Sequence, residues 1–217
     1  MKKLIATNRY FFLPVLIFLI FSGIILLTFS KPDLHVRCNQ VNSHFLDIFF
    51  QYATWLGNGV FIPVLFIGLL LVKYRIAFAF LAGSLLGALV VNLFKKVLLH
   101  NMYRPAKYFE LYESYKLHLV EGVKTHSLQS FPSGHTATAF SIFLTLALIT
   151  RNKALKLFFF AIALLIAYSR VYLSQHFFMD IAAGTVIGVG FIVLSFYFFE
   201  RINKKWLDQS LLKRRTL

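Results

Sequence analysis

Residues 169–200 read SRVYLSQHFFMDIAAGTVIGVGFIVLSFYFFE, a polar beginning followed by one long apolar run. The run from about 178 to 199 is as long as one crossing of a lipid bilayer. Arg170, His176 and Asp180 stand at its start in the pattern S-R-x5-H-x3-D. The stretch therefore predicts a membrane helix with an ionisable cluster at one end.

The composition predicts the same kind of protein for the whole chain. Of 217 residues, 59% are hydrophobic and 14% are charged, and a soluble domain of this length could not bury that much apolar surface. Further apolar runs lie near residues 10–30, 56–72, 76–98, 133–150 and 155–174. The first run is longer than the core of a cleaved signal, so we expect an uncleaved helix. We predict an all-α polytopic membrane bundle of about six transmembrane helices, forming a single domain over residues 1–217.

The distribution of basic residues predicts the orientation. With the N-terminus inside, fourteen of the 23 lysines and arginines fall in cytoplasmic segments, and all seven histidines fall outside. The positive-inside rule then places both termini in the cytoplasm and the motif-bearing loops on the periplasmic or exterior face. We interpret the basic tail at 200–217, with Lys213, Arg214 and Arg215, as an anchor to anionic lipid. No nucleic-acid partner is expected, despite the net charge of +15.

His176 and Asp180 are four residues apart, so they share one face of a helix. A carboxylate there can fix one imidazole tautomer and leave the other ring nitrogen free to attack an electrophile. The alternative is a buried polar pair that braces two helices. The presence of Arg170 six residues earlier favours a catalytic role for this pair over a structural one, because ionisable groups inside a membrane are unfavourable unless they have a function.

A second cluster, Pro132-Ser133-Gly134-His135, opens the apolar run near 133–150. Ser133 is a suitable N-cap, and a helix N-terminus with a glycine lets backbone amides approach an anion. His135 could protonate a leaving oxygen. By itself, the tetrapeptide could also be an ordinary capped helix start.

A third cluster, Lys96 with Arg104-Pro105, supplies cations that suit phosphate, since a guanidinium binds phosphate oxygens in pairs. Taken alone, it could equally be a pair of side chains extending to the membrane surface. A carboxylate-based metal site is not expected, because the chain has only eight acids and Asp180 alone lies in a motif. The single cysteine, Cys38, excludes an intrachain disulfide and a cysteine-based zinc site.

Together the clusters resemble the motifs of the type 2 phosphatidic acid phosphatase superfamily, integral membrane lipid phosphate phosphatases. The resemblance covers roughly residues 76–199, and the two clusters that contain histidine match residue for residue. The family's first motif is usually K-x6-R-P, whereas Lys96 gives K-x7-R-P. Either Lys96 or Lys95 could therefore occupy the lysine position.

The resemblance implies that His176 is the nucleophile and forms a phosphohistidine. Asp180 would orient His176, and His135 would give a proton to the leaving lipid oxygen. No cofactor is implied. The expected phosphate-binding residues are Arg104, Arg170, Lys96, Ser133 and Gly134.

The predicted function is a metal-independent phosphatase of envelope lipids, acting on phosphate or pyrophosphate groups in the membrane. Lipid A, undecaprenyl pyrophosphate, phosphatidylglycerophosphate and phosphatidic acid are the candidate substrates, with a slight preference for the first two. A lipid phosphotransferase using the same residues is an alternative. A transporter is a more distant one, because it would place charges at the bilayer midplane. The physiological substrate and the oligomeric state are left open.

Two glycine pairs, Gly83/Gly87 and Gly184/Gly188, have the small-xxx-small spacing that lets helices approach closely. We interpret them as contacts within the bundle, with a dimer seam as the alternative.

Overall fold

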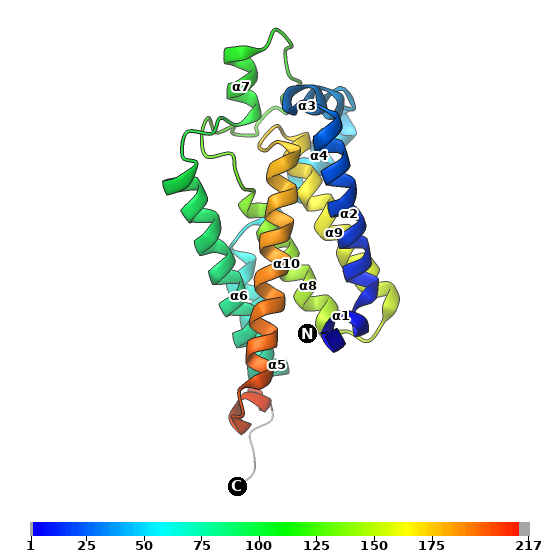
Figure 1. Ribbon diagram of the computed structural model, residues 1–217, viewed down its shortest axis with the longest axis vertical. Coiled ribbons are helices and arrows are strands. Elements are labelled where there is room, and N and C mark those ends of the chain that lie inside the picture. Colours follow the sequence, from blue (N-terminus) through cyan, green and yellow to red (C-terminus); the bar gives the residue numbers. More distant parts are fainter. Residues whose placement is uncertain (1, 213–217) are drawn as a thin grey trace.

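The computed structural model describes residues 2–212, and in that part of the chain every regular element is helical. The all-α prediction is therefore confirmed (Figure 1). Lys213, Arg214 and Arg215, the predicted lipid anchor, lie outside the described residues. The helices are α1 (Lys2–Thr7), α2 (Arg9–Thr28), α3 (Lys31–Gln40), α4 (His44–Ala53), η1 (Thr54–Gly57), α5 (Phe61–Val72), α6 (Tyr74–Leu93), η2 (Phe94–Leu98), α7 (Pro105–Tyr112), α8 (Gly134–Ile149), α9 (Lys153–Tyr172), α10 (Phe178–Arg201) and η3 (Lys205–Asp208).

Four helices in the described part of the chain are long and apolar enough to cross a membrane: α2, α6 with its η2 extension, α9 and α10. The segment His44–Gly57 and the helix Phe61–Val72 would together make a fifth crossing, bent by 56°. In this bent pair, α4 and η1 form the part before the break and α5 forms the part after it. The remaining apolar helix, α8, has 16 residues.

Helix α8 lies inside the bundle and packs closely against α10. A Cβ atom added at Gly184 would lie 2.6 Å from the Ser133 carbonyl oxygen, and one at Gly188 would lie 2.4 Å from the Ala137 carbonyl oxygen. Real Cβ atoms do not approach backbone oxygens this closely, so both positions need glycine. On the other side of α10, a Cβ at Gly83 of α6 would lie 2.9 Å from the Phe191 carbonyl oxygen. Both glycine pairs thus include contacts within the bundle, as predicted.

Aromatic side chains join α2 to α8 and α9. The buried ring of Phe11 packs edge-on against Phe140 of α8 and Phe160 of α9, with ring centroids 6.4 and 6.0 Å apart. Edge-to-face pairs of this kind add to the free energy that ring burial alone contributes. They connect elements that are far apart in the sequence.

The bundle has two distinct ends (Figure 1). At the α7 end lie α3, the beginning of α4 and the start of α10, with the loops that carry the sequence motifs. At the α1 end lie α1 and the end of α10. The two polar motifs that open α8 and α10 therefore meet at the α7 end.

Two cations at the α1 end, Lys156 and Arg75, have oxygen partners. Lys156, which is 3% exposed, donates to the Asn8 side-chain oxygen and to the Thr7 carbonyl. Arg75 donates through two nitrogens to the two carboxylate oxygens of Asp208, each 2.9 Å away, and also to the carbonyls of Phe199 and Ile202.

Candidate active site

A cavity of about 450 Å³ opens at the α7 end. Four cationic side chains and three histidines line it, and no carboxylate does among the described residues. A pocket with this charge is suited to an anion, because nothing in its lining neutralises the cations. We call it the phosphate cavity; its ionisable lining residues are Lys95, Arg104, Lys124, Arg170, His126, His135 and His176.

His176 lies at the bottom of this cavity, with 1% of its surface exposed. Its Nδ1 is 3.2 Å from the Asp180 Oδ2 atom, so a neutral ring that donates from Nδ1 has its Nε2 lone pair free. The same carboxylate oxygen accepts the Phe177 amide at 3.0 Å and the Ser130 hydroxyl at 2.5 Å. Three donors thus fix the carboxylate that orients His176.

Burial is the largest influence on the protonation of His176. Burial, and then the charges of Arg104, Lys95 and Arg170, hold the pKa of this imidazole well below its usual value. The ring is therefore neutral at physiological pH, which is the form that can act as a nucleophile. Burial also lowers the pKa of the Arg104 guanidinium, which stays a cation.

The second predicted cluster is at the start of α8. The Ser133 hydroxyl caps the helix by accepting the Thr136 amide at 3.3 Å, as predicted. The Ser133 amide, however, donates to the Asp180 carbonyl at 3.0 Å, and the residue is fully buried. Ser133 therefore cannot offer this amide to phosphate, which corrects its assignment as a phosphate-binding residue.

Gly134 and His135 do line the phosphate cavity. Their amides belong to the first turn of α8, where backbone N–H groups have no partner within the helix. They are also next to the positive end of the helix dipole. Of the turn that was predicted to bind an anion, these two residues face the cavity and Ser133 caps the helix.

Arg170 ends α9 and is 7% exposed. One of its terminal nitrogens donates to the Thr54 hydroxyl at 2.6 Å, while its Nε is buried and lacks a hydrogen-bond partner within the described residues. A buried guanidinium with an unmatched donor is unfavourable unless a ligand completes it. This orphaned donor indicates where an anion would bind.

The first cluster differs from its prediction. Lys95 lines the phosphate cavity and is half-buried, whereas Lys96 is exposed and is not among the lining residues. The helix widens into a π turn at Phe94–Leu98, and such a turn holds one residue more than an α turn. This turn lies where the two lysines stand, and Lys95, not Lys96, lines the cavity.

Arg104 is held by backbone oxygens around the cavity. Its Nε donates to the Leu128 carbonyl at 3.0 Å, and a terminal nitrogen donates to the Gln175 carbonyl at 3.2 Å. The Gln175 side chain in turn donates to the Lys124 carbonyl at 3.0 Å. This buried glutamine therefore connects the segment just before His176 to the loop that contains Lys124, which also lines the cavity.

Several site residues were not predicted from the sequence. Ser130 and Gln175 lie next to motif residues, and that proximity is the only signal that could have found them. Thr54 comes from η1, more than a hundred residues from Arg170, and nothing in the sequence marks it. Within the part of the chain that the structure describes, no group of three or more His, Cys, Asp or Glu side chains could hold a metal ion.

Comparisons with known proteins identify the family of this chain. The sequence model of the PAP2 superfamily matches residues 53–204. A lipid A 4'-phosphatase of Porphyromonas gingivalis is 28% identical over 83% of this chain and 77% of its own length. A dihydrosphingosine 1-phosphate phosphatase of Schizosaccharomyces pombe is 24% identical over 76% of this chain, which spans 41% of that protein.

Two crystal structures share the fold. LpxE of Aquifex aeolicus superposes with a TM-score of 0.67 over 78% of this chain and 96% of its own, at 28% identity. A PAP2-type phosphatidylglycerolphosphate phosphatase of Bacillus subtilis superposes with a TM-score of 0.63 over 94% of this chain and 99% of its own. That second protein is 21% identical, so the likeness concerns the fold alone.

Proposed function

This chain belongs to the PAP2 superfamily, the family predicted from its motifs, and from that premise we propose that it hydrolyses lipid phosphates through a phosphohistidine on His176. The observation that carries the proposal is the phosphate cavity. Four cations surround a neutral, carboxylate-oriented imidazole there, and no acidic side chain in the described lining opposes an anion. The arrangement supplies a nucleophile together with charge stabilisation.

In the first step, the Nε2 lone pair of His176 attacks phosphorus and the bond from phosphorus to the lipid oxygen breaks. The proton stays on Nδ1 of His176, where Asp180 accepts its hydrogen bond, and the carboxylate balances the positive charge that develops on the ring. His135 gives a proton to the departing lipid oxygen, and the approaching phosphate dianion favours the protonated form of His135. Lys95, Arg104 and Arg170 stabilise the three non-bridging oxygens.

In the second step, water attacks the phosphohistidine. His135, now neutral, accepts a proton from this water, and the bond between phosphorus and Nε2 breaks. Inorganic phosphate leaves, and His176 returns to the neutral form that Asp180 orients. The two steps need only these side chains and one water molecule, and they conserve charge and protons.

We further propose that the bundle crosses the membrane six times, with α8 as the fourth crossing and the α7 end outside. A 16-residue helix is about 24 Å long, somewhat less than the hydrocarbon thickness. Ten buried residues in α8 support this assignment, because other helices cover it and its N-terminus can lie below the membrane surface. Both termini then lie in the cytoplasm, in accord with the distribution of lysine and arginine.

For the substrate we propose a lipid phosphate of the bacterial envelope, with lipid A as the first candidate. The alignment with the lipid A 4'-phosphatase of Porphyromonas gingivalis supports this choice, since it covers most of both chains. Undecaprenyl pyrophosphate, phosphatidylglycerophosphate and phosphatidic acid are the other members of the panel to be measured.

The test is release of inorganic phosphate by the purified protein in detergent, with EDTA present and with each lipid of the panel in turn. We expect release that vanadate blocks, because vanadate can adopt the five-coordinate geometry of the transferring phosphorus. Activity that is lost on chelation and restored by Mg²⁺ would contradict the histidine mechanism. Phosphate that appears on an acceptor lipid instead of in solution would identify a phosphotransferase.

The orientation has a separate test. In a Cys38→Ser background, Lys116→Cys should react with an impermeant thiol reagent added outside intact cells, and Lys153→Cys should not. The opposite pattern of labelling would reverse the proposed orientation.

A further inference from the structure

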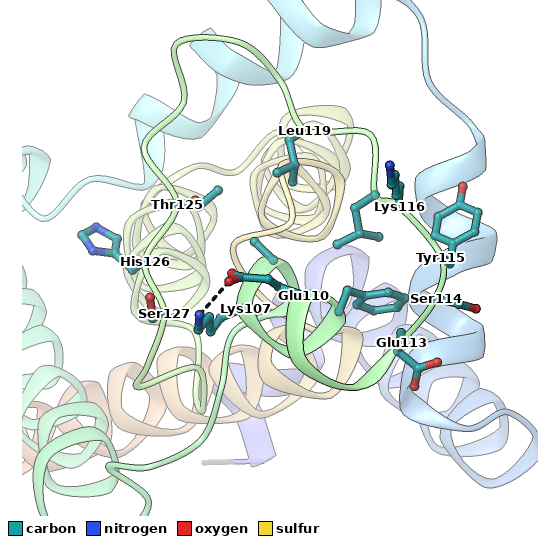
Figure 2. Close-up of a pocket in the computed structure, with 13 residues that line it drawn as sticks. Lys107, Glu110, Glu113, Ser114, Tyr115, Lys116, Leu119, Thr125, His126 and Ser127 are labelled. Carbon is teal, nitrogen blue, oxygen red and sulfur yellow. Dashed lines mark hydrogen bonds and ion pairs between the residues drawn. The ribbon is translucent and has the colours of Figure 1, made fainter.

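A second cavity, of about 500 Å³, lies between α7 and the loop that follows it. Figure 2 shows the loop curving around α7, with lining side chains contributed by both. Its volume falls in the range of small-ligand sites. It shares His126 with the phosphate cavity, so the two cavities lie on either side of one residue.

The charge of this second cavity differs from that of the first. Lys107 and Lys116 are matched by Glu110 and Glu113, and the Lys107 ammonium is 2.8 Å from a Glu110 carboxylate oxygen. Partial burial of His126, and then the positive charges of Arg104 and Lys124, lower the pKa of its imidazole. The ring is therefore neutral. The lining has no excess of either sign, so it favours neither a second phosphate nor a cationic headgroup.

The uncharged part of the lining is amphipathic. Tyr115, Ser114 and Thr125 offer hydroxyl groups, and Leu117 and Leu119 offer apolar surface. Alternating hydrogen-bonding groups and apolar contacts match a sugar ring, which has hydroxyls at its rim and C–H groups on its faces. Carboxylates and ammonium groups add acceptors and donors for the hydroxyls.

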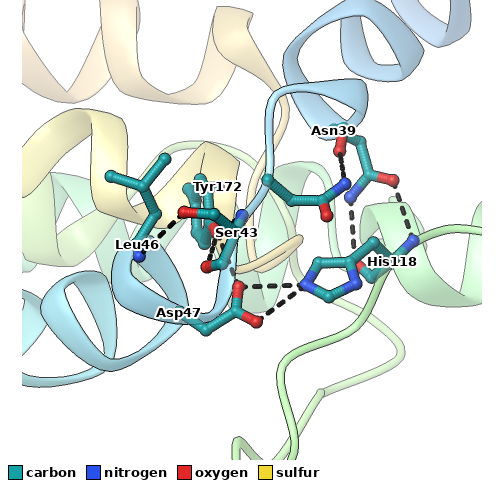
Figure 3. Close-up of polar contacts among 7 residues, drawn as sticks. Asn39, Ser43, Leu46, Asp47, His118 and Tyr172 are labelled. Carbon is teal, nitrogen blue, oxygen red and sulfur yellow. Dashed lines mark hydrogen bonds and ion pairs between the residues drawn. The ribbon is translucent and has the colours of Figure 1, made fainter.

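The loop that forms the outer wall is fixed in place. Asn39 donates to the His118 carbonyl and accepts the His118 amide, each at 2.8 Å, and the His118 ring is 2.9 Å from Asp47 (Figure 3). Tyr172 of α9 donates to the same carboxylate at 2.5 Å. At the other end of the loop, the Arg104 amide donates to the Ser127 carbonyl at 2.9 Å. Such preorganisation reduces the entropy that binding removes.

From these contacts we propose that the second cavity, here called the headgroup cavity, binds a neutral, hydroxyl-rich sugar headgroup while the phosphate of the same lipid occupies the phosphate cavity. The inference rests on the proposed function, because it assigns the headgroup of that same substrate. His126 lies where the two parts of the ligand join. The headgroup cavity then selects glycolipid phosphates over lipids whose phosphate carries no headgroup.

The experiment compares two lipids with matched acyl chains: a diacylated glucosamine 1-phosphate and phosphatidic acid. The selectivity is the ratio of kcat/KM for the glycolipid to kcat/KM for phosphatidic acid. In the double variant Glu110→Gln and Glu113→Gln, we expect this ratio to fall about tenfold, as the loss of one or two hydrogen bonds predicts. Thr125→Trp, which fills the cavity, should lower the ratio further.

The matched control is Glu121→Gln, an exposed acid of the same loop outside the cavity lining, and it should keep the parent ratio. The thermal unfolding of each variant is measured in detergent to check that the substitutions leave the protein folded. An unchanged ratio in both cavity variants, or an equal loss with both lipids, overturns the headgroup assignment and leaves the phosphatase intact. No phosphate release from any lipid by the parent protein would instead overturn the proposed function, and with it the inference.

Discussion

The two ends of the bundle contain cations in different surroundings. At the α1 end, Lys156 has side-chain and carbonyl oxygens as partners, and Arg75 is matched by Asp208. At the α7 end, Arg170 has one hydroxyl partner and a buried Nε without one among the described residues, and no carboxylate shares the cavity. The first arrangement stabilises a fold, whereas the second leaves a buried donor that we propose an anion completes.

This difference separates cations that hold the structure from cations that bind a ligand. Removal of a partnered cation leaves its oxygens without a donor, so it should lower stability. Removal of a cation from the phosphate cavity removes like-charge repulsion and an unmatched buried donor, so it should affect catalysis far more than folding. The following variants test that contrast, beginning with the largest expected effect.

His176→Ala removes the nucleophile and should abolish both turnover and the phosphoenzyme. Acid quenching after brief incubation with radiolabelled lipid phosphate measures the trapped, acid-labile phosphate. In the parent protein, the acid limb of kcat/KM should lie below the ordinary histidine value of about 6.5, because the pKa of His176 is lowered. A phosphoenzyme on His176→Ala that is absent from His135→Ala would mean that the two histidines have exchanged roles.

Asp180→Asn keeps the size of the side chain but should reduce kcat by up to about 10⁴-fold, because an amide can hold the wrong imidazole tautomer. Ser130→Ala is the matched comparison. It removes one of three donors to the same carboxylate and should have a smaller effect. Steady-state phosphate release provides both values, and a larger loss in Ser130→Ala would contradict the role given to Asp180.

His135→Ala should reduce lipid hydrolysis by about 10²–10⁴-fold, the usual contribution of a general acid. With p-nitrophenyl phosphate, whose leaving group needs no proton, part of that loss should disappear. Parallel rates on the two substrates give the comparison. An equal loss on both would remove His135 from the proton transfer.

Arg170→Gln and Arg75→Gln form the direct test of the two ends. Arg170→Gln should lower kcat/KM by about 10²–10³-fold, as for loss of one transition-state donor, with little change in thermal unfolding. Arg75→Gln should leave activity nearly unchanged and lower the Tm by about 2–4 °C for each kcal/mol of lost stability. The reverse pattern would refute the distinction.

Lys95→Gln and Lys96→Gln test the smallest effect. Lys95→Gln should weaken kcat/KM about tenfold, because one point charge near phosphate is lost. Lys96→Gln should behave like the parent, since that side chain is exposed and outside the cavity lining. Phosphate release from one lipid is sufficient, and equal activities for the two variants would place neither lysine at the phosphate.

The long helices were largely predictable because each coincides with a predominantly apolar run of the sequence. The run predicted at 178–199 corresponds to Phe178–Arg201, and the run predicted at 155–174 corresponds to Lys153–Tyr172. The bend before α5 was not predicted, because the Asn58 side chain accepts the Val60 amide there in a local turn. Such turns depend on short polar contacts that hydropathy does not register.

The candidate site was predictable where chemistry and local spacing coincide. The contact between His176 and Asp180 was predicted from their spacing of four residues, and the structure has it at 3.2 Å. The predicted shared helix face is wrong, because His176 lies in the loop before α10 and only Asp180 belongs to that helix. Lys95 lines the cavity where Lys96 was predicted, and both lysines lie in the π turn Phe94–Leu98, which hydropathy and spacing did not indicate. Thr54 could not be predicted, because only tertiary packing brings η1 to Arg170.

The contact between α8 and α10 at Gly184 has a mechanical consequence. The Ser133 carbonyl touches Gly184, and the Ser133 amide is bonded to the Asp180 carbonyl, so the beginnings of the two helices adjoin backbone to backbone. His135 lies in the first turn of α8, and His176 lies just before α10. If the surrounding bilayer thins or stretches, we expect both helices to tilt together and the two imidazoles to keep their separation. Turnover should therefore depend little on the chain length of the host lipid.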